Sequence, residues 1–280
     1  MDRRNFLKTG GMVVLGSMAA SSVLRAESLK GAHDASGISS ALNHFGVSQE
    51  DMKKVLAAAL EKGSDYADLF FEHTFNNYVG LQDGAVNRCN SNIDFGVGIR
   101  VLAGDQTGYA YVENVTLKEM LNAARTAARI ATGGKATLPV ALTDKPIKTN
   151  YYSVKMPWEE VILKSKMPYL QRLNDRIFAL DKRVHKVSAS LTDTTSHILF
   201  CNSEGVMYYD YRPMVTLGAV CIMEENGKVE NGYAARAYRM GFEFLNDDVV
   251  ELLAQEAVAK TSFVFQEVKP KGGEMPVVMG

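Results

Sequence analysis

The segment YADLFFEHTFNNYVGLQDG, residues 66–84, decides the fold of the first half of the chain. Residues 66–75 are rich in aromatic side chains, which favour a β-strand, and we expect Asn76-Asn77 to turn the chain. Residues 78–82 resume the strand pattern. Asp83-Gly84 is a dipeptide that strongly favours a two-residue hairpin turn. The segment therefore predicts the start of an antiparallel sheet.

The chain after this hairpin continues the strand pattern. Three further segments with turn residues between them follow it: 85–92 (a polar strand or loop), 95–102 and 109–113. Consecutive strands joined by tight turns pair antiparallel. We therefore expect a meander from residue 66 to residue 113.

Helices are predicted on both sides of this meander. Ser48, with Asp51 three residues later, has the pattern of a helix N-cap, and apolar residues then recur at helical spacing. Residues 116–130 carry an apolar helical face, which Gly133-Gly134 ends. Residues 48–133 are predicted to form an N-terminal helix–meander–helix domain.

A second unit is predicted after a boundary. Residues 134–157 carry three prolines and little periodicity, as expected of a linker. Residues 159–180 have a broad apolar helical face, and we expect Pro168 to kink or divide this helix. The strand pattern returns in five segments: 184–192, 197–202, 206–211, 214–223 and 232–238. A helix capped around Asn246 follows at 249–260.

Two units, each an antiparallel sheet flanked by helices, indicate the α+β class. The second unit, a central α+β domain, is predicted at 158–268. Residues 269–280 have the pattern of a loop that enters a buried strand. Because the backbone groups of a buried strand need partners, we expect these residues to begin a C-terminal domain that is missing from this sequence.

The first 26 residues are predicted to be a targeting segment. Arg3 and Arg4 form a twin-arginine pair before an apolar run rich in Gly, Ala and Ser, with Ala26 as the cleavage point. The alternative, a membrane anchor, needs about 20 apolar residues, so we expect no stable anchor. Twin-arginine export to the periplasm is the predicted localisation. Residues 27–47 are predicted to be a linker with a short helix near 39–45.

Composition and charge exclude several classes of function. The chain has 280 residues, of which 46% are hydrophobic and 22% charged, which is ordinary for a globular protein. Without the first 26 residues, 27 bases stand against 31 acids, so electrostatics gives no reason to expect nucleic-acid binding. Cys89, Cys201 and Cys221 allow at most one bridge, Cys201–Cys221, and buried unpaired thiols are the favoured interpretation.

No complete active site can be assembled from the sequence. The histidines lack an H-E-x-x-H pattern. His73 follows Glu72 in a predicted strand, so the two side chains point to opposite faces. His185 and His197 lie in consecutive predicted strands and could meet across a sheet, but two ligands do not make a zinc site. We therefore expect no catalytic and no metal-binding residue in this chain.

A glycine pair occurs within the meander. Gly96-Val97-Gly98 begins like a dinucleotide-binding motif but lacks its third glycine and its strand–helix context. Close approach of another backbone to a twisted strand is the simpler interpretation. A bare strand edge can also accept an extended peptide.

Several motifs occur in order along the chain: GSDYADLFFE (63–72), DFGVGIRV (94–101), GYAY (108–111), NSEG (202–205) followed by Arg212-Pro213, NGYA (231–234), GFEFL (241–245) and GEMPVV (273–278). In content and order they resemble the N-terminal and central regions of the TldD/PmbA family, also called the modulator of DNA gyrase family. The resemblance covers about residues 48–280 and is closer to the TldD branch than to the PmbA (TldE) branch.

This resemblance implies the front part of a zinc metallopeptidase that acts on peptides or unfolded proteins, as a homodimer or a TldD/TldE-type heterodimer. In the family, an H-E-x-x-x-H helix and a cysteine of the C-terminal domain hold the zinc. This sequence lacks that domain, so we expect neither zinc nor activity from the chain alone. Its role would be to supply the substrate channel and dimer contacts, with four candidate channel residues: Gly96, Gly98, Arg100 and Gly108.

Two other functions compete with this one. The chain could be a non-catalytic module that binds a peptide or a partner subunit without cutting it. A regulator of DNA topology, which the family's alternative name suggests, is disfavoured by the acidic balance and by the export signal. The export signal is itself a departure from the better-known family members, which are cytosolic.

Overall fold

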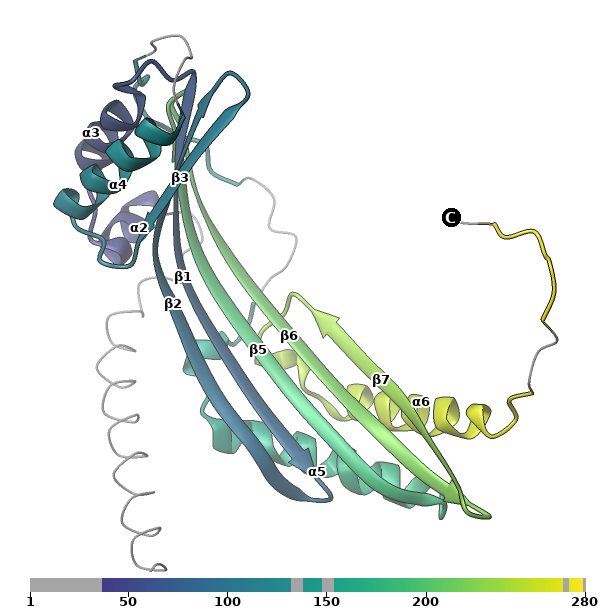
Figure 1. The fold of residues 1–280 in the computed structure, drawn as a ribbon. Coiled ribbons are helices and arrows are strands. Elements are labelled where there is room, and N and C mark those ends of the chain that lie inside the picture. The colour runs from purple at the N-terminus through teal and green to yellow at the C-terminus, as the bar shows by residue number, and fades with distance from the viewer. Residues whose placement is uncertain (1–36, 132–137, 148–153, 269–271, 279–280) are drawn as a thin grey trace, which may run out of the picture.

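A computed structural model describes residues 37–131, 138–147, 154–268 and 272–278, and its main feature is one long, curved, seven-stranded sheet (Figure 1). The strand order is β3-β2-β1-β5-β6, and both β4 and β7 pair with β6. All pairings are antiparallel except that of β4 with β6. The strands are β1 (Tyr66–Gln82), β2 (Ala85–Ala103), β3 (Gln106–Val112), β4 (Thr143–Asp144), β5 (Val184–Asn202), β6 (Val206–Glu225) and β7 (Lys228–Tyr238).

Two groups of helices pack on this sheet, one toward each end (Figure 1). The first group is α2 (Ile38–Phe45), α3 (Gln49–Leu60) and α4 (Leu117–Ile130). The second group is the 3-10 turn η1 (Trp158–Glu160), α5 (Leu163–Leu180), the 3-10 turn η2 (Phe242–Phe244) and α6 (Asp247–Val264).

Both groups cover the same face of the sheet. Phe71 of β1 lies in the hydrophobic core under the first group, and Val79 of β1 lies in the core under the second. The two residues are separated by an even number of positions, so their side chains point to the same face. The fold therefore has two hydrophobic cores on one sheet.

Side-chain caps fix where three of the helices begin. The hydroxyl of Ser48 accepts a hydrogen bond from the Asp51 backbone N–H at 3.1 Å, and the Asp51 carboxylate accepts one from the Ser48 N–H. Thr116 and Asn246 each accept a hydrogen bond from the backbone N–H three residues later. These reciprocal and single caps satisfy donors at helix ends. The predicted caps at Ser48 and Asn246 are confirmed, although α6 begins at Asp247 instead of 249.

The α+β class is confirmed, but the prediction of two separate sheets is wrong. β1 and β5 pair from Asp68↔Asn202 to Gln82↔Ser188, which joins the two meanders into one sheet. β1 also runs straight through Asn76-Asn77, where a turn was expected. The predicted Asp83-Gly84 hairpin is confirmed, with φ of 49° and 80° at the two turn residues.

Of three further local predictions, one is confirmed and two differ from the structure. The predicted short helix near 39–45 is confirmed as α2, which packs Ala41 and Phe45 into the first core. α5 begins at Leu163 instead of 159 and continues undivided through Pro168. Residues 272–278 form no strand and Val278 is exposed, so the buried strand predicted there is not present in the described residues.

The predicted export signal at 1–26 lies outside the described residues and stays a prediction, as does the glycine stop at 133–134. Among the helices that the structure describes, none is both long and apolar enough to cross a membrane. All three cysteines are free, with Cys201 and Cys221 buried and Cys89 exposed, so unpaired thiols are confirmed at the two buried positions.

Candidate substrate groove and a buried polar band

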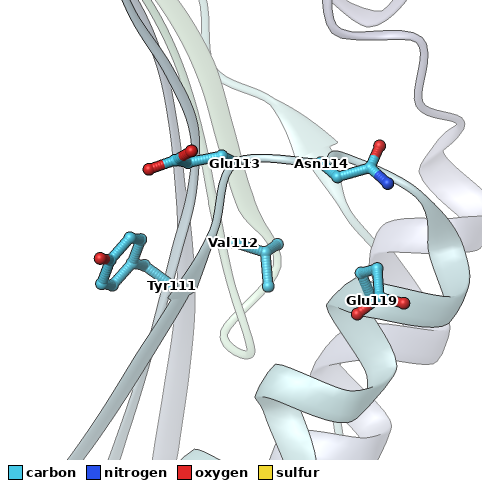
Figure 2. A pocket seen from close by; sticks show the side chains of 5 residues that line it. All are labelled: Tyr111, Val112, Glu113, Asn114 and Glu119. Atoms are coloured by element: carbon cyan, nitrogen blue, oxygen red, sulfur yellow. The ribbon is translucent and has the colours of Figure 1, made fainter.

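Two adjoining hollows, of about 480 and 540 Å³, lie where β3 ends beside β2, and we call them together the groove. They share Tyr111 and Glu113. The first is further lined by Phe70, Glu72, Ile93, Asp94, Phe95, Gly96, Val97, Gly98 and Tyr109. The second is further lined by Val112, Asn114 and Glu119 (Figure 2).

The short connection from β3 to α4 shapes this groove. Figure 2 shows Tyr111 and Glu113 on one side of β3 and Val112 on the other, as side-chain alternation along a strand requires. Because Thr116 caps α4 directly after the connection, Glu119 is held in the first turn of the helix. The groove therefore rests on the regular elements β1, β2, β3 and α4 and on a loop of only a few residues.

Gly96 and Gly98, two of the predicted channel residues, form part of the groove wall. A Cβ atom on Gly96 would come within 2.5 Å of the Val112 carbonyl oxygen, and one on Gly98 would come within 2.5 Å of the Tyr109 hydroxyl. Gly96 thus allows the end of the β3 backbone to lie closely against β2, and Gly98 allows the Tyr109 ring to do so. The rings above them are open to solvent, since Tyr109 is 57% and Tyr111 67% exposed.

Arg100 and Gly108, the other two candidates, lie outside the groove. The Arg100 guanidinium donates to the Asp68 carboxylate across the β1–β2 pair, with an Nε–Oδ2 distance of 2.9 Å. This partner raises the pKa of Arg100. A Cβ atom on Gly108 would collide with the Ala127 carbonyl oxygen of α4. Gly108 therefore serves helix packing on the other face of the sheet.

The groove is acidic and aromatic. Its described lining residues include four carboxylates but no lysine or arginine: Glu72, Asp94, Glu113 and Glu119. Glu72 accepts a hydrogen bond from the Thr74 hydroxyl and Asp94 accepts one from the Asn92 amide, both neutral donors. Carboxylates beside exposed aromatic faces attract cationic groups. The groove is therefore suited to hold a basic side chain or an amino group of an extended chain.

A second polar feature, which sequence reasoning missed, crosses the helix-covered face between the two cores. His44 of α2, His73 of β1 and His197 of β5 meet there: His44 Nε2 lies 2.8 Å from His73 Nδ1, and the His44 ring stacks on that of His197 at 4.6 Å. His185 lies on the same strand as His197, so the prediction that these two could meet across a sheet is wrong. Nothing in the local sequence links the three histidines.

Glu159 of η1 connects this histidine cluster to the second core. Its carboxylate accepts hydrogen bonds from His197 Nε2 at 3.0 Å and from the Tyr211 hydroxyl at 3.1 Å. Burial raises the pKa of Glu159, but the hydrogen bond and charge of His197 outweigh it, so the pKa lies below its usual 4.5. Burial also raises the pKa values of Tyr209 and Tyr211.

Next along the same face, Lys166 of α5 binds Asp193 of β5. The Nζ–Oδ2 distance is 2.5 Å, and the two side chains are only 4% and 2% exposed. Asn77 of β1 donates to the other carboxylate oxygen at 2.8 Å. We call the histidines, Glu159, the two tyrosines and this triad the polar band.

Two family models match the chain. One, described as PmbA/TldA metallopeptidase domain 1, matches residues 67–131, and the other, described as the PmbA/TldA metallopeptidase central domain, matches residues 157–262. Together they cover more than half of the chain, in the order that the family has. The chain belongs to the PmbA/TldD family. The resemblance stated from the sequence motifs is thereby confirmed.

Individual relatives within the PmbA/TldD family are named as TldD homologues. A metalloprotease TldD homologue of Haemophilus influenzae is 30% identical over 242 residues, covering 84% of this chain and 50% of the relative. One of Buchnera aphidicola subsp. Acyrthosiphon pisum is 28% identical, covering 86% and 51%. The chain thus spans about half the length of the curated relatives it matches.

Solved structures of PmbA/TldD proteins share the fold. A Thermotoga maritima protein named as a modulator of DNA gyrase superposes with a TM-score of 0.63 at 18% identity, covering 80% of this chain and 50% of that one. TldE from Thermococcus kodakarensis superposes with a TM-score of 0.57 at 16% identity, covering 76% and 47%. At these identities the likeness establishes the architecture alone.

The metallopeptidase name of the PmbA/TldD family raises the question of a metal site. Within the ranges that the structure describes, no three His, Cys, Asp or Glu side chains are arranged to hold a metal ion. In the histidine cluster, His44 and His73 bind each other, and both ring nitrogens of His197 are engaged by Tyr209 and Glu159. The described residues of this PmbA/TldD chain therefore do not fit a zinc site.

We expect Glu159→Gln to make the stability of this PmbA/TldD chain less sensitive to acid. A carboxyl whose folded-state pKa is lowered contributes stability that is complete above its unfolded pKa and is lost as pH falls through the folded pKa. Thermal melts of the native chain should therefore fall more steeply below about pH 4.5 than those of the variant. Equal slopes for both would contradict the assigned role of Glu159.

Proposed function

We propose that this chain is the substrate-handling and dimer-forming part of a TldD-like metallopeptidase that acts on peptides or unfolded proteins. The groove at the end of β3 is the observation that carries the proposal. It is open, lies beside a strand edge and combines exposed rings with carboxylates that have no basic partner among the described residues. The metalloprotease names of the relatives support the reaction class.

An extended chain fits the chemistry of this groove better than a folded surface does. The missing side chains of Gly96 and Gly98 let β3 and its Tyr109 ring lie closely on β2, and the exposed rings of Tyr109 and Tyr111 offer flat faces to passing side chains. Contacts of this kind depend little on sequence, which suits a channel for varied peptides. The carboxylates add a preference for basic residues, since opposite charges attract most strongly where little water separates them.

We assign no cleavage step to the described residues, because they do not fit a zinc site. The chain by itself is expected to bind peptide without cutting it. That behaviour is also what the alternative function, a non-catalytic peptide- or partner-binding module, would give. The two functions differ once the zinc-binding domain of a full-length family member is supplied. Only a peptidase part would then support hydrolysis of the bound peptide.

The test is binding of a fluorescent, unstructured, lysine-rich peptide to the purified chain, followed by anisotropy. Glu113→Lys should weaken binding about tenfold, because it places a like charge inside the groove, and Tyr111→Ala should weaken it by a similar factor. Glu204→Lys is the matched control, since Glu204 is exposed in the turn after β5, away from the groove. It should leave the affinity within about twofold.

Three results decide the outcome of this experiment. Weakening by both groove variants, but not by Glu204→Lys, supports the groove as the peptide site. Equal weakening by Glu113→Lys and Glu204→Lys, with no effect of Tyr111→Ala, would show that only net charge matters and would overturn the assignment. Stoichiometric zinc with chelator-sensitive hydrolysis by the chain alone would contradict its expected lack of activity.

A further inference from the structure

One stretch of the sheet edge in the described structure has no neighbouring strand. β3 covers β2 only from Val97 to Ala103, and a register shift opposite Gly80 and Leu81 interrupts the hairpin end of β2. Between these limits lie Arg88–Asp94, and every residue of this stretch is exposed. We call Arg88–Asp94 the open edge. Strand edges of this length carry backbone donors and acceptors that a further strand can use.

The hydrogen-bonding pattern identifies which residues of the open edge point outward. Ser203 N–H donates to the Ala67 carbonyl and Asp83 N–H donates to the Val187 carbonyl, so odd-numbered residues of β1 bind β5. Even-numbered residues of β1 therefore bind β2, and their partners in the open edge are the even-numbered ones. Cys89, Ser91 and Ile93 consequently present their backbone N–H and C=O away from the sheet.

We propose that the open edge pairs with the open edge of a second copy of this chain, antiparallel, about a two-fold axis through Ser91. In this register Ser91 lies opposite Ser91 of the second copy, and the outward-pointing Cys89 lies opposite Ile93. A two-fold interface has to be self-complementary, because each residue meets its counterpart twice. The inference deepens the dimer part of the proposed function and rests on it.

The charges of the open edge are self-complementary in this register. Arg88 lies opposite Asp94 of the second copy, and the symmetry creates the same pair at the other end. Asn90 lies opposite Asn92 in the same way. Opposite charges and amides facing each other across an antiparallel pair are stabilising. Sliding either copy by two residues would place Arg88 opposite Asn92 or Gly96 instead and would leave both charges without a counterpart.

The two charged side chains are already positioned for this pairing. The Arg88 guanidinium lies over the Tyr78 ring, 5.2 Å from its centroid, and the Asp94 carboxylate is held by the Asn92 amide at 3.1 Å. Neither has an ion-pair partner among the described residues of its own chain. Asp94 and Ile93 also line the groove, so the second copy would bring its Arg88 to the mouth of the peptide site.

Disulfide trapping of the full chain tests the register. In a Cys89→Ser background, Ser91→Cys places two thiols directly opposite each other, where the Cα–Cα distance of about 5.5 Å suits a disulfide. Asn90→Cys is the matched control, because residue 90 of the second copy is offset by two residues from the position opposite it, a diagonal separation of about 7–8 Å that is too long for a disulfide. We expect mild oxidation to cross-link Ser91→Cys at least tenfold faster than Asn90→Cys. Equal rates would overturn the register.

Charge exchange tests the pairing without any cysteine. Arg88→Asp and Asp94→Arg, each alone, place like charges opposite each other and should raise the dimer dissociation constant about tenfold in sedimentation. The double variant exchanges the two charges and should restore the native dimer dissociation constant. All three are surface changes, so circular dichroism melts should stay close to those of the native chain.

The outcomes separate this inference from the proposed function. A dimer that neither cross-links through Ser91→Cys nor responds to the charge exchange would overturn pairing at the open edge. The dimer interface would then lie elsewhere on the chain. A chain that stays monomeric at high concentration overturns the inference and the dimer part of the proposed function together. Peptide binding is tested separately with Glu113→Lys and Tyr111→Ala, which lie outside the open edge, whereas Asp94→Arg changes a groove residue and is used only to judge the dimer.

Discussion

Lys166→Ala is expected to lower the free energy of unfolding by about 3–5 kcal/mol, which is among the largest effects of any single substitution in this chain. The ammonium of Lys166 is buried against the Asp193 carboxylate, and it also lies 5.3 Å from the centre of the Trp158 ring. Burial raises the pKa of Asp193, and the Lys166 charge opposes that rise. Removing the ammonium leaves a buried carboxylate without its counter-charge.

Urea denaturation of matched variants measures this effect. Lys164→Ala removes an exposed lysine from the same helix and should change stability by less than about 0.5 kcal/mol. The double variant Lys166→Met with Asp193→Leu removes both charges and should recover most of the loss, since an apolar pair of similar volume needs no counter-charge. A loss below 1 kcal/mol for Lys166→Ala would show that the pair is not buried as described.

Gly108→Val is expected to cost about 3 kcal/mol or more, because the space beside Gly108 is already filled by helix α4. A Cβ atom there would overlap the Ala127 carbonyl oxygen and lie 3.2 Å from the Ala131 backbone nitrogen. These are backbone atoms, which cannot rotate out of the way as a side chain can. Relief would require α4 to move off the sheet, and buried residues of the first core, such as Met120 and Ala124, would lose contacts.

The same variant separates a packing glycine from a channel glycine. If Gly108 lined a substrate channel, Gly108→Val would keep its thermal melting temperature and lose only peptide affinity. We expect instead that Gly108→Val lowers the melting temperature, and that any loss of peptide affinity follows from this loss of stability. Gly273→Ala is the control, because a Cβ atom there meets nothing within 4 Å. Its melting temperature should equal that of the native chain.

Local features of the fold were predictable because local physics determines them. The caps at Ser48, Thr116 and Asn246 depend on residues three positions apart, and the Asp83-Gly84 turn depends on two residues that tolerate positive φ. The single sheet was not predictable in this way. It depends on β1 pairing with β5, and the register between segments so distant in sequence has no local signal.

The polar band explains why long strands were predicted as broken ones. Asn76-Asn77 and the polar residues between Thr192 and His197 lie in mid-strand, beneath the interval between the two helix groups. Their side chains donate hydrogen bonds to buried carboxylates: Asn77 to Asp193 and Thr195 to Glu159. In the sequence, however, such polar residues are indistinguishable from those of a loop. The tertiary environment therefore overrides the local pattern at these positions.

For the candidate site, the sequence identified Gly96 and Gly98 through their motif, and the structure places both in the groove. It grouped Arg100 and Gly108 with them because all four lie in neighbouring motifs. Gly108 faces helix α4 on the opposite side of the sheet, whereas Arg100 lies on the same face as Gly96 and Gly98 but is bound by Asp68; neither can be deduced before the pairing partners are known. The acidic character of the groove comes from four segments and appears only when they are assembled.

Because β1, β5 and β6 run unbroken beneath both cores (Figure 1), the two ends of this protein cannot swing about a hinge in the connecting segment. Three lengths of hydrogen-bonded backbone resist such a movement together. Relative motion of the ends is restricted to torsion and bending distributed along the sheet, so a load applied at α6 would be transmitted mechanically to the strands that hold the groove.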